Sequence, residues 1–192
     1  MERRPDRFTA VLDANVLVGS LTRNVLLHLG EAGFYRPRWS AKILREVKSA
    51  LERQGKRDAY LDNLFAKMAI AFPEASVEDW EIYEPVATAL PDKGDRHVLA
   101  AAIKCDAAVI VTENLKDFPI EALKPTAIQA VSADKFIADL ADLDQASAAA
   151  AIERMRLGFR HPEYTWMKLI DRMDEIGLRE SAAIFRASNP GR

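Results

Sequence analysis

Residues 8–18 read Phe-Thr-Ala-Val-Leu-Asp-Ala-Asn-Val-Leu-Val, an apolar run that contains one aspartate, Asp13, and one asparagine, Asn15. A short apolar run without alternation is typical of a parallel strand that is buried on both faces. A carboxylate inside such a run is costly unless a partner compensates it. We therefore expect Asp13 to stand at the carboxyl end of the first strand, where ligands bind in folds with parallel sheets.

Two further apolar segments predict strands, at Ala107–Thr112 and at Ala127–Val131. Tyr35–Trp39 predicts a short edge strand or a connector, because Pro37 lacks the N–H group that a residue of a central strand donates to its neighbour. Periodic patterns predict helices at 24–30, 40–53, 58–72, 95–104 and 132–140, with Ser40 as the N-cap of the second. Ser76 and Asp79 resemble a capping pair for a further short helix.

The alternation of strands and helices predicts the fold class. We expect an α/β, three-layer sandwich with a mainly parallel sheet flanked by helices. Residues after about Asp142 lack strand patterns and indicate two or three short helices, broken near Gly158–Pro162 and Gly177. The sequence therefore predicts a domain at residues 8–140 and a small all-α C-terminal extension at residues 142–192.

The composition excludes several classes of protein. With 49% hydrophobic and 29% charged residues among 192, the chain is expected to fold rather than remain disordered. Its apolar runs are too short to span a bilayer, and its charged start lacks the apolar segment of a signal peptide. Cys105 is the only cysteine, which excludes an internal disulfide and fits a reducing, cytoplasmic location. The net charge of −2 counts mildly against a nucleic-acid binder, unless several acids bind cations.

Two more acids share the inward-facing stripes of predicted helices. Glu46 lies three positions after Ile43, on the stripe that Ile43 and Val47 define. Asp95 opens the helix whose apolar stripe begins at Val98. No Arg or Lys occupies a matching inward position, so a shared hard cation with oxygen ligands is the least costly partner for these acids and Asp13. Without such a cation, clustered carboxylates repel one another and their pKa values rise.

Each of these residues also has a simpler interpretation. Taken singly, Asp95 fits an ordinary acid in the first turn of a helix, and Glu46 fits a solvated helix residue. His97 follows Asp95 by two positions and is expected to project elsewhere, as a packing or surface residue. Trp39 and Tyr35 fit core packing better than stacking on bases. Basic residues between the first strand and Arg57 fit either a phosphate-binding track or a solvated face: Arg36, Arg38, Lys42, Arg45, Arg53, Lys56 and Arg57.

Four segments in this order resemble the PIN domain, with the spacing of VapC-type toxins from bacterial toxin–antitoxin pairs. They are Leu12-Asp13-Ala14-Asn15-Val16-Leu17, the helix of Glu46, the stretch from Asp92 to Ala102, and Val111-Thr112-Glu113-Asn114-Leu115-Lys116-Asp117-Phe118. The resemblance covers about residues 8–140. The helical tail resembles an extension found on a subgroup of this family.

The resemblance implies an endoribonuclease that depends on Mg²⁺ or Mn²⁺ and leaves a 5′-phosphate and a 3′-hydroxyl. It assigns catalytic, metal-binding roles to Asp13, Glu46 and Asp95. The fourth metal position falls on Asn114, a neutral ligand where many members carry Asp, and Asp117 is a nearby substitute. Asp92, Asn15 and Thr112 take supporting roles. RNA, a cognate antitoxin and a second copy of the chain are the implied partners. From the placement of the basic residues, the candidate RNA contacts are Arg36, Arg38 and Arg45.

Two other functions compete with this hypothesis. One is a non-catalytic RNA-binding or protein-interaction module on the same fold, which Asn114 in place of an acid favours. The other is a Mg²⁺ phosphotransferase of the haloacid-dehalogenase type. That class requires Asp-x-Asp after the first strand, and Asn15 stands at the second position here. The sequence therefore disfavours the phosphotransferase.

Overall fold

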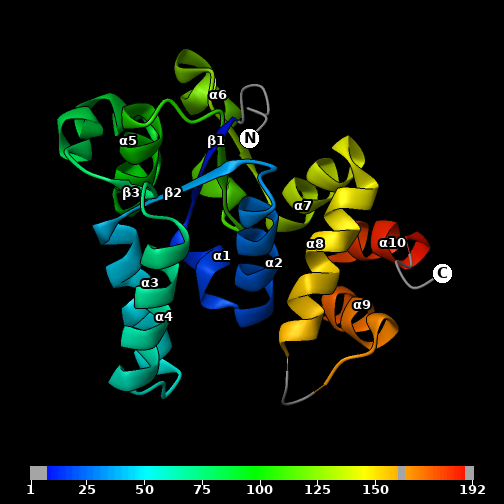
Figure 1. The fold of residues 1–192 in the computed structure, drawn as a ribbon. Coiled ribbons are helices and arrows are strands. Elements are labelled where there is room, and N and C mark those ends of the chain that lie inside the picture. Colours follow the sequence, from blue (N-terminus) through cyan, green and yellow to red (C-terminus); the bar gives the residue numbers. More distant parts are fainter. Residues whose placement is uncertain (1–7, 160–162, 189–192) are drawn as a thin grey trace. The chain divides into compact units, whose positions relative to one another are not determined.

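The computed structural model describes residues 8–159 and 163–188 (Figure 1). Contacts divide them into two compact units. The first unit holds the described residues up to Val18 together with Tyr35–Val131. The second holds Gly19–Phe34 together with the described residues from Ser132 onward. The segment Gly19–Phe34 thus groups with helices from the end of the chain. The division into functional domains at residues 8–140 and 142–192 stays a prediction.

The first unit is built on a five-stranded sheet with the order β3-β2-β1-β4-β5, in which every pairing is parallel. The strands are β1 (Thr9–Leu12), β2 (Arg36–Ser40), β3 (Ser76–Val77), β4 (Val109–Val111) and β5 (Gln129–Val131). Ala10, Val11 and Leu12 are fully buried, as the uninterrupted apolar run predicts. The predicted α/β fold with a parallel sheet is therefore confirmed.

The first strand is shorter than its apolar run. It ends at Leu12, and Ala14–Val18 forms the short helix α1 instead of continuing the strand. The Asp13 carboxylate accepts a hydrogen bond from the Ala14 backbone N–H at 2.6 Å, which withdraws that N–H from any strand pairing. Val16 and Leu17 are buried on α1, so the apolar residues of the second half serve a helix.

The prediction of an edge position for the Tyr35–Trp39 segment is wrong, because β2 lies between β1 and β3. Arg36 N–H donates to Phe8 O on the side of β1, and Trp39 N–H donates to Ala75 O on the side of β3. Alternation along the strand turns the nitrogen of Pro37 toward β3. Since β3 pairs only with Trp39 and Ser40, Pro37 has no partner strand on that side and its missing N–H costs nothing.

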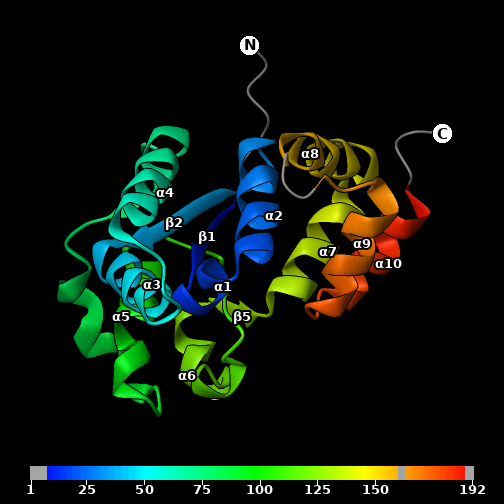
Figure 2. The ribbon, with the colours of Figure 1, turned by 90° about the horizontal axis from the view of Figure 1, so that it is seen from below.

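Helices cover the sheet of the first unit. They are α3 (Ala41–Arg53), α4 (Asp58–Ala71), α5 (Arg96–Lys104) and α6 (Ile120–Leu123), with 3₁₀ helices η1 (Trp80–Ala89), η2 (Lys93–Asp95), η3 (Leu115–Asp117) and η4 (Lys124–Thr126). The α5 helix packs on β1, β2 and β4, and α3 lies beside α1 (Figure 1 and Figure 2). Ser40 caps α3 as predicted, since its side chain accepts from Ile43 N–H. Ser76 instead belongs to β3 and Asp79 makes no side-chain cap, so that predicted capping pair is wrong.

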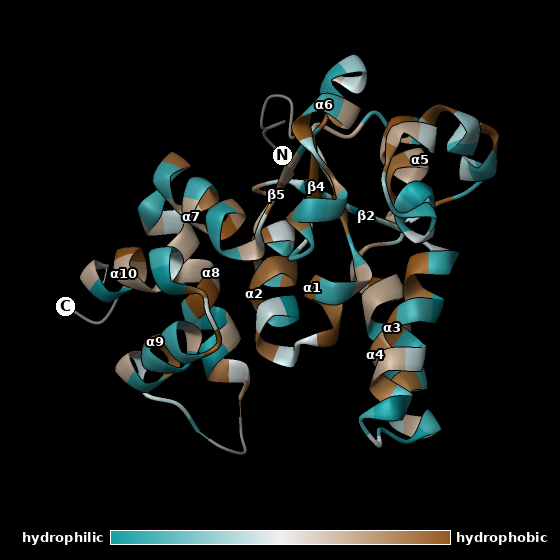
Figure 3. Cartoon of the chain, turned by 180° about the vertical axis from the view of Figure 1, so that it is seen from behind, coloured by the Kyte–Doolittle hydropathy of each residue, from teal (hydrophilic) through white to brown (hydrophobic). Residues whose placement is uncertain are grey.

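The second unit is helical. It contains α2 (Ser20–Glu31), α7 (Ala133–Leu143), α8 (Gln145–Gly158), α9 (Trp166–Glu175) and α10 (Arg179–Ala187). The helix α2 begins before the predicted Asn24 and runs past Gly30, and the left-handed turn falls at Gly33 (φ 84°). Hydrophobic and hydrophilic residues lie side by side along α9 and α10 (Figure 3), and α9 buries Trp166, Leu169, Ile170 and Met173. Among the described residues, the helices are all too short or too polar to cross a membrane.

Candidate active site

The site begins where β1 and β4 end. These neighbouring parallel strands have their carboxyl ends at the same edge of the sheet, with Leu12 in register with Val111. Asp13 and Thr112 are the next residues on each strand, and both are buried. The backbone N–H of Asp13 donates to Val111 O at 3.0 Å, which extends the pairing by one residue. Two polar side chains are thus placed together by the sheet itself.

A network of hydrogen bonds fixes the Asp13 carboxylate. Its Oδ2 accepts from the Asn15 amide at 2.6 Å and from the Thr112 hydroxyl at 2.7 Å. The Thr112 oxygen in turn accepts from the Asn15 amide at 2.9 Å and from the Asn114 backbone N–H at 3.0 Å. Asn15 Oδ1 accepts from the Glu113 backbone N–H at 3.0 Å. Asn15 and Thr112 therefore orient Asp13 and join α1 to the loop after β4.

Burial raises the pKa of the Asp13 carboxyl above its ordinary value of 3.8. The hydrogen bonds from Thr112 and Ala14 oppose that rise, while the negative charge of Glu46 adds to it. Asp13 and Glu46 thus repel each other although they come from different elements. This agrees with the expectation that clustered carboxylates have raised pKa values.

A group of three acids lies next to Asp13. Ligand oxygens of Asp92, Asp95 and Asp117 all lie within 4.8 Å of one another. Burial, followed by the charges of Asp13, Asp92 and Asp117, raises the pKa of Asp95 from 3.8 to about 6. Asp95 Oδ2 is buried and has no hydrogen-bond partner among the residues that the structure describes. An acid in this state lacks the compensation that buried polar atoms normally have.

Local structure places each member of this group of three. Asp92 accepts a hydrogen bond from Gly94 N–H at 2.7 Å, which starts the tight turn of η2. Asp95 ends η2 directly before α5, whose first N–H groups favour negative charge. Asp117 ends η3, and its carboxylate accepts a hydrogen bond from the Asn114 side-chain amide. Asn114 therefore braces Asp117 through its amide nitrogen, and Asp117 lies with the acids.

Glu46 joins the site through a residue whose position the sequence did not predict. His97 Nε2 lies 2.9 Å from Glu46 Oε1, and the His97 side chain is only 1% exposed. His97 is a buried packing residue against Trp80, which was one of its two expected roles, but the expectation that it projects away from the acids is wrong because it also contacts Glu46 on α3. Residues two positions apart on a helix lie on different sides of it. The position of Asp95 therefore could not indicate that the side chain of His97 also faces the site.

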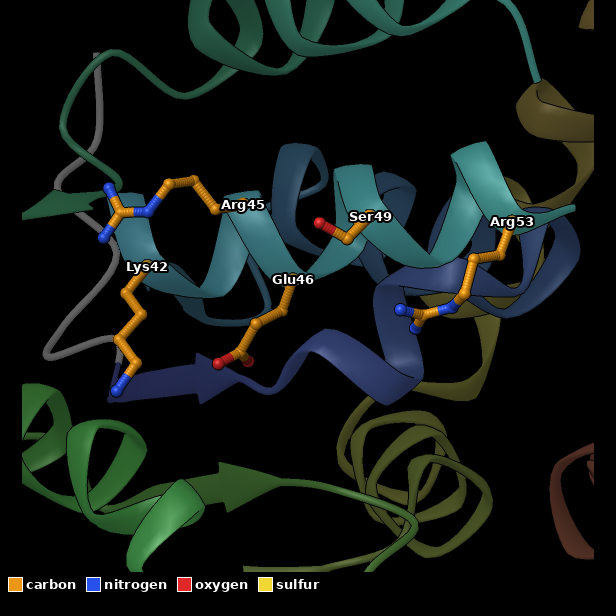
Figure 4. A pocket seen from close by; sticks show the side chains of 5 residues that line it. All are labelled: Lys42, Arg45, Glu46, Ser49 and Arg53. Atoms are coloured by element: carbon orange, nitrogen blue, oxygen red, sulfur yellow. The ribbon is translucent and has the colours of Figure 1, made fainter. Parts of the chain in front are cut away.

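The basic residues fall into two places. Lys42, Arg45 and Arg53 line a groove of about 340 Å³ along α3, together with Glu46 and Ser49 (Figure 4). The three cations outnumber the single acid there. Arg36 instead begins β2, at the end of the strand opposite to the acids, and the charge of Arg38 acts on Cys105 at the far end of α5. The structure thus brings Arg45 close to Glu46 and leaves Arg36 and Arg38 away from the acids.

Comparison with known proteins agrees with this fold. The sequence model of the PIN domain matches residues 9–116, and that of the VapC50 C-terminal domain matches residues 133–187. The chain therefore belongs to the PIN-domain family, and it carries a VapC50-type C-terminal extension.

Part of the chain aligns with part of a curated relative. A Mycobacterium tuberculosis protein with the name "Putative ribonuclease VapC50" is 46% identical over 81 residues, which cover 42% of this chain and 48% of that protein. The aligned segment thus spans about half the length of the curated relative.

The residues present fit a divalent cation. Oxygen ligands from acids are the donors that Mg²⁺ and Mn²⁺ prefer. The unpartnered, buried Asp95 Oδ2 and the raised pKa values of Asp13 and Asp95 are the signs of a carboxylate cluster that lacks its compensating charge. A cation would relieve both, because it pairs the orphaned oxygen and lowers the repulsion between the acids.

Proposed function

We propose that this protein is a Mg²⁺- or Mn²⁺-dependent endoribonuclease that hydrolyses RNA phosphodiester bonds. The observation that carries the proposal is the buried, unpartnered oxygen of Asp95 inside a cluster of acids at the carboxyl edge of a parallel sheet. Membership of the PIN-domain family and the name of the M. tuberculosis relative support the class of reaction.

Each acid has a proposed role. Asp13 and Asp95 would hold the principal ion, and Glu46 would act as a co-ligand or orient the attacking water. When bound, such an ion activates a water and offsets the negative charge of the phosphate. Asn15 and Thr112 hold Asp13 in one orientation through the bonds described above. Fixing a ligand in this way reduces the entropy that binding would otherwise cost.

A second group of acids would complete the metal centre. Asp117 and Asp92 lie with Asp95 and supply the charge that neutral Asn114 does not. Asn114 would act by bracing Asp117, to which its amide donates a hydrogen bond. Whether this set holds one ion or two is a question that metal titration answers directly, by the number of ions bound per chain.

The RNA backbone would lie along α3. Lys42, Arg45 and Arg53 form a groove that also holds Glu46, so a chain of phosphates bound there would continue toward the acids (Figure 4). Arg45 and Arg53 are eight positions apart, which corresponds to about 12 Å along a helix and allows contacts to successive phosphates. The predicted RNA contacts at Arg36 and Arg38 lie away from this groove.

We extend the proposal to the biological setting. The protein would act as the toxin of a toxin–antitoxin pair, in the cytoplasm, with a cognate antitoxin as inhibitor and a homodimer as the assembled form. The VapC50-type extension at residues 133–187 supports this setting. Co-expression with the product of an adjacent small reading frame tests the antitoxin, because a true partner would copurify and suppress cleavage.

A non-catalytic RNA-binding or interaction module is the second candidate. The observation that favours it is Asn114, whose amide is engaged with Asp117 where many family members carry an acid. On this alternative the protein would bind RNA through the α3 groove without cleaving it. The two candidates therefore differ in one measurable property, which is the dependence of RNA cleavage on a divalent ion.

The test is cleavage of a mixed cellular RNA pool by the purified protein in Mn²⁺, in Mg²⁺ and in EDTA. Wild type is compared with an Asp13→Ala, Asp95→Ala double variant and with the isosteric Asp95→Asn. Asp62→Asn, which changes an exposed acid on α4, is the matched control. We expect wild type and Asp62→Asn to cleave only with the metal, and the site variants to lose at least about 100-fold in rate.

Equal residual activity in wild type and in the site variants would identify a contaminant. The catalytic proposal would then fail in favour of the binding module. Metal-dependent cleavage that survives the loss of both Asp13 and Asp95 would instead show a nuclease whose site lies elsewhere.

A further inference from the structure

His97 is a buried polar side chain in a mainly apolar setting. It lies on α5, is 1% exposed, and packs edge-on against the Trp80 ring with the ring centroids 5.8 Å apart. Trp80 itself belongs to a hydrophobic cluster with Val77, Ala100 and Ala101. A polar ring buried in this way costs free energy unless it makes a hydrogen bond of matching value.

The ring has one such bond. Its Nε2 lies 2.9 Å from Glu46 Oε1, while Nδ1 is buried and meets no hydrogen-bond partner within residues 8–159 and 163–188. A carboxylate oxygen accepts, so Nε2 carries the hydrogen. In the neutral ring, Nδ1 is then the acceptor nitrogen and Nε2 the one donor. The surroundings of the ring thus direct its one donor at Glu46.

Glu46 is held in place by fewer contacts than Asp13 is. Its side chain is 42% exposed, whereas Asp13 is 4% exposed and is held by Asn15 and Thr112. A glutamate on a helix surface samples several rotamers, and holding it in one costs up to about 1.5–2 kcal/mol of side-chain entropy. In the groove, the cations Lys42 and Arg45 also offer competing partners for its carboxylate. A fixed hydrogen-bond donor such as His97 Nε2 favours one rotamer of Glu46 and competes with pairing to these cations.

We propose that His97 is a positioning residue that holds the Glu46 carboxylate toward Asp13, so that the site is oriented before it binds an ion or a substrate. The inference rests on the proposed function, since it gives Glu46 a task in the metal centre. It adds a residue on a third element: Glu46 comes from α3, Asp13 follows β1, and His97 comes from α5. The Trp80 ring packs against the imidazole of His97.

Two substitutions separate the donor from the shape of the ring. His97→Phe keeps a flat ring against Trp80 but removes the donor to Glu46. His97→Gln places a side-chain amide nitrogen near the position of Nε2 and keeps the donor. His97→Asn carries the same amide on a shorter side chain that falls short of Glu46, so it replaces His97→Phe if that variant fails to fold. His28→Phe, a change on α2 in the other unit, is the control.

The primary measurement is Mn²⁺ binding to each full-length variant by calorimetry, with cleavage kinetics as a second readout. We expect the Mn²⁺ dissociation constant to rise by about 10–100-fold in His97→Phe and by less than about 3-fold in His97→Gln and His28→Phe. In cleavage, we expect kcat to fall while KM for RNA stays nearly constant, because RNA binding uses the α3 groove. In a Glu46→Ala background, His97→Phe should change the dissociation constant no further.

Equal Mn²⁺ affinity in wild type and in His97→Phe or His97→Asn would overturn the inference and leave the proposed nuclease intact. Loss of affinity in His97→Gln as large as in His97→Phe would assign His97 a packing role only, and would also overturn it. Absence of Mn²⁺ binding by wild type would defeat the proposed function and this inference together, and the calorimetry of wild type alone distinguishes that case.

Discussion

The Thr112 hydroxyl donates a 2.7 Å hydrogen bond to Asp13 Oδ2, although the two residues are 99 positions apart in the chain. They are the residues that follow β4 and β1, which are paired in parallel and in register. The sheet therefore brings a buried carboxylate and the hydroxyl that orients it to one edge. This pair gives the most direct test of how the proposed centre is held.

We expect Thr112→Val to weaken both the fold and the centre. Valine has nearly the same shape but no hydroxyl, so Asp13 Oδ2 loses one donor and the Asn114 N–H loses an acceptor. Loss of such a buried bond costs about 1–3 kcal/mol of unfolding free energy. Urea denaturation measures the stability, and RNA cleavage should fall by about 10–100-fold. Thr112→Ser keeps the hydroxyl and should restore most of both, whereas equal values for valine and wild type would contradict the role.

Asp95→Asn should raise the stability of the metal-free protein at neutral pH. The pKa of Asp95 is raised to about 6 in the folded state, above its ordinary value of 3.8. The folded state thus binds the proton of Asp95 more tightly than the unfolded state does. Ionised Asp95 therefore destabilises the folded state, and this destabilisation is fully present above about pH 6 and is lost as pH falls toward 4. Asparagine removes that penalty, and the melting temperature of the variant should exceed that of wild type only on the high side of this window.

Mn²⁺ should reverse that order. Added ion stabilises a state that binds it, so wild type should gain more in melting temperature than Asp95→Asn. The same thermal scans, run from pH 4 to pH 8 in EDTA and again in Mn²⁺, check both parts. A variant that is less stable than wild type in EDTA at pH 7.5 would show that Asp95 is not under the repulsion described.

The N-cap of α3 offers a test of stability that is separate from metal binding. The side chain of Ser40, which is fully buried, accepts the Ile43 N–H at 3.2 Å. Ser40→Ala should cost about 1 kcal/mol, with a melting temperature lower by roughly 2–4 °C. Ser132→Ala removes the matching cap of α7, where Ser132 accepts from Lys135 N–H at 3.2 Å, and serves as the comparison in the other unit. Unchanged melting in both would mean that neither cap contributes.

The α3 groove predicts a change in the salt dependence of RNA binding. Arg45→Ala together with Arg53→Ala removes two of the cations that line it. Binding of a labelled single-stranded RNA, measured by anisotropy in EDTA, should weaken. The negative slope of log K against log salt should become less steep by about 1.4, because two phosphate contacts are lost. Arg154→Ala, which removes one exposed cation on α8 in the other unit, is the control for loss of a surface charge outside the groove. An unchanged slope in the double variant would place the RNA elsewhere, and Arg36→Ala would then be the next variant to measure.

Cys105 should react slowly with alkylating reagents. Burial raises the pKa of its thiol to about 11, against the opposing charge of Arg38. Since the thiolate is the reactive form, its fraction at pH 8 is far below that of a free cysteine with a pKa of about 8.5. Mass spectrometry after iodoacetamide treatment should therefore show much slower labelling of folded than of urea-unfolded protein, with a rate that rises toward pH 10. Equal rates would contradict the burial of this thiol.

The sequence predicted those features whose physical cause is local. The apolar runs at Thr9–Leu12 and Val109–Val111 are strands because both of their faces are buried, and Ser40 caps α3 because its side chain reaches the N–H group three residues ahead. The position of Asp13 at a strand end followed from its break in an apolar run. The helix α2 starts at Ser20, four residues before the predicted Asn24, because its N-cap is Gly19, which has no side chain that could mark the start of the helix.

What the sequence by itself determined is the kind of fold, the elements that carry its acids and the helical character of its final segment, since periodicity and capping act within a few residues. Tertiary structure alone decided which distant residues meet. The interior place of β2, the contact of His97 with Glu46, the approach of Asp117 to Asp92 and Asp95, and the grouping of α2 with α7 and α8 all depend on strand order and helix packing. Such contacts join residues dozens of positions apart, and no local pattern encodes them, because their free energy arises only when the whole sheet and its helices are assembled.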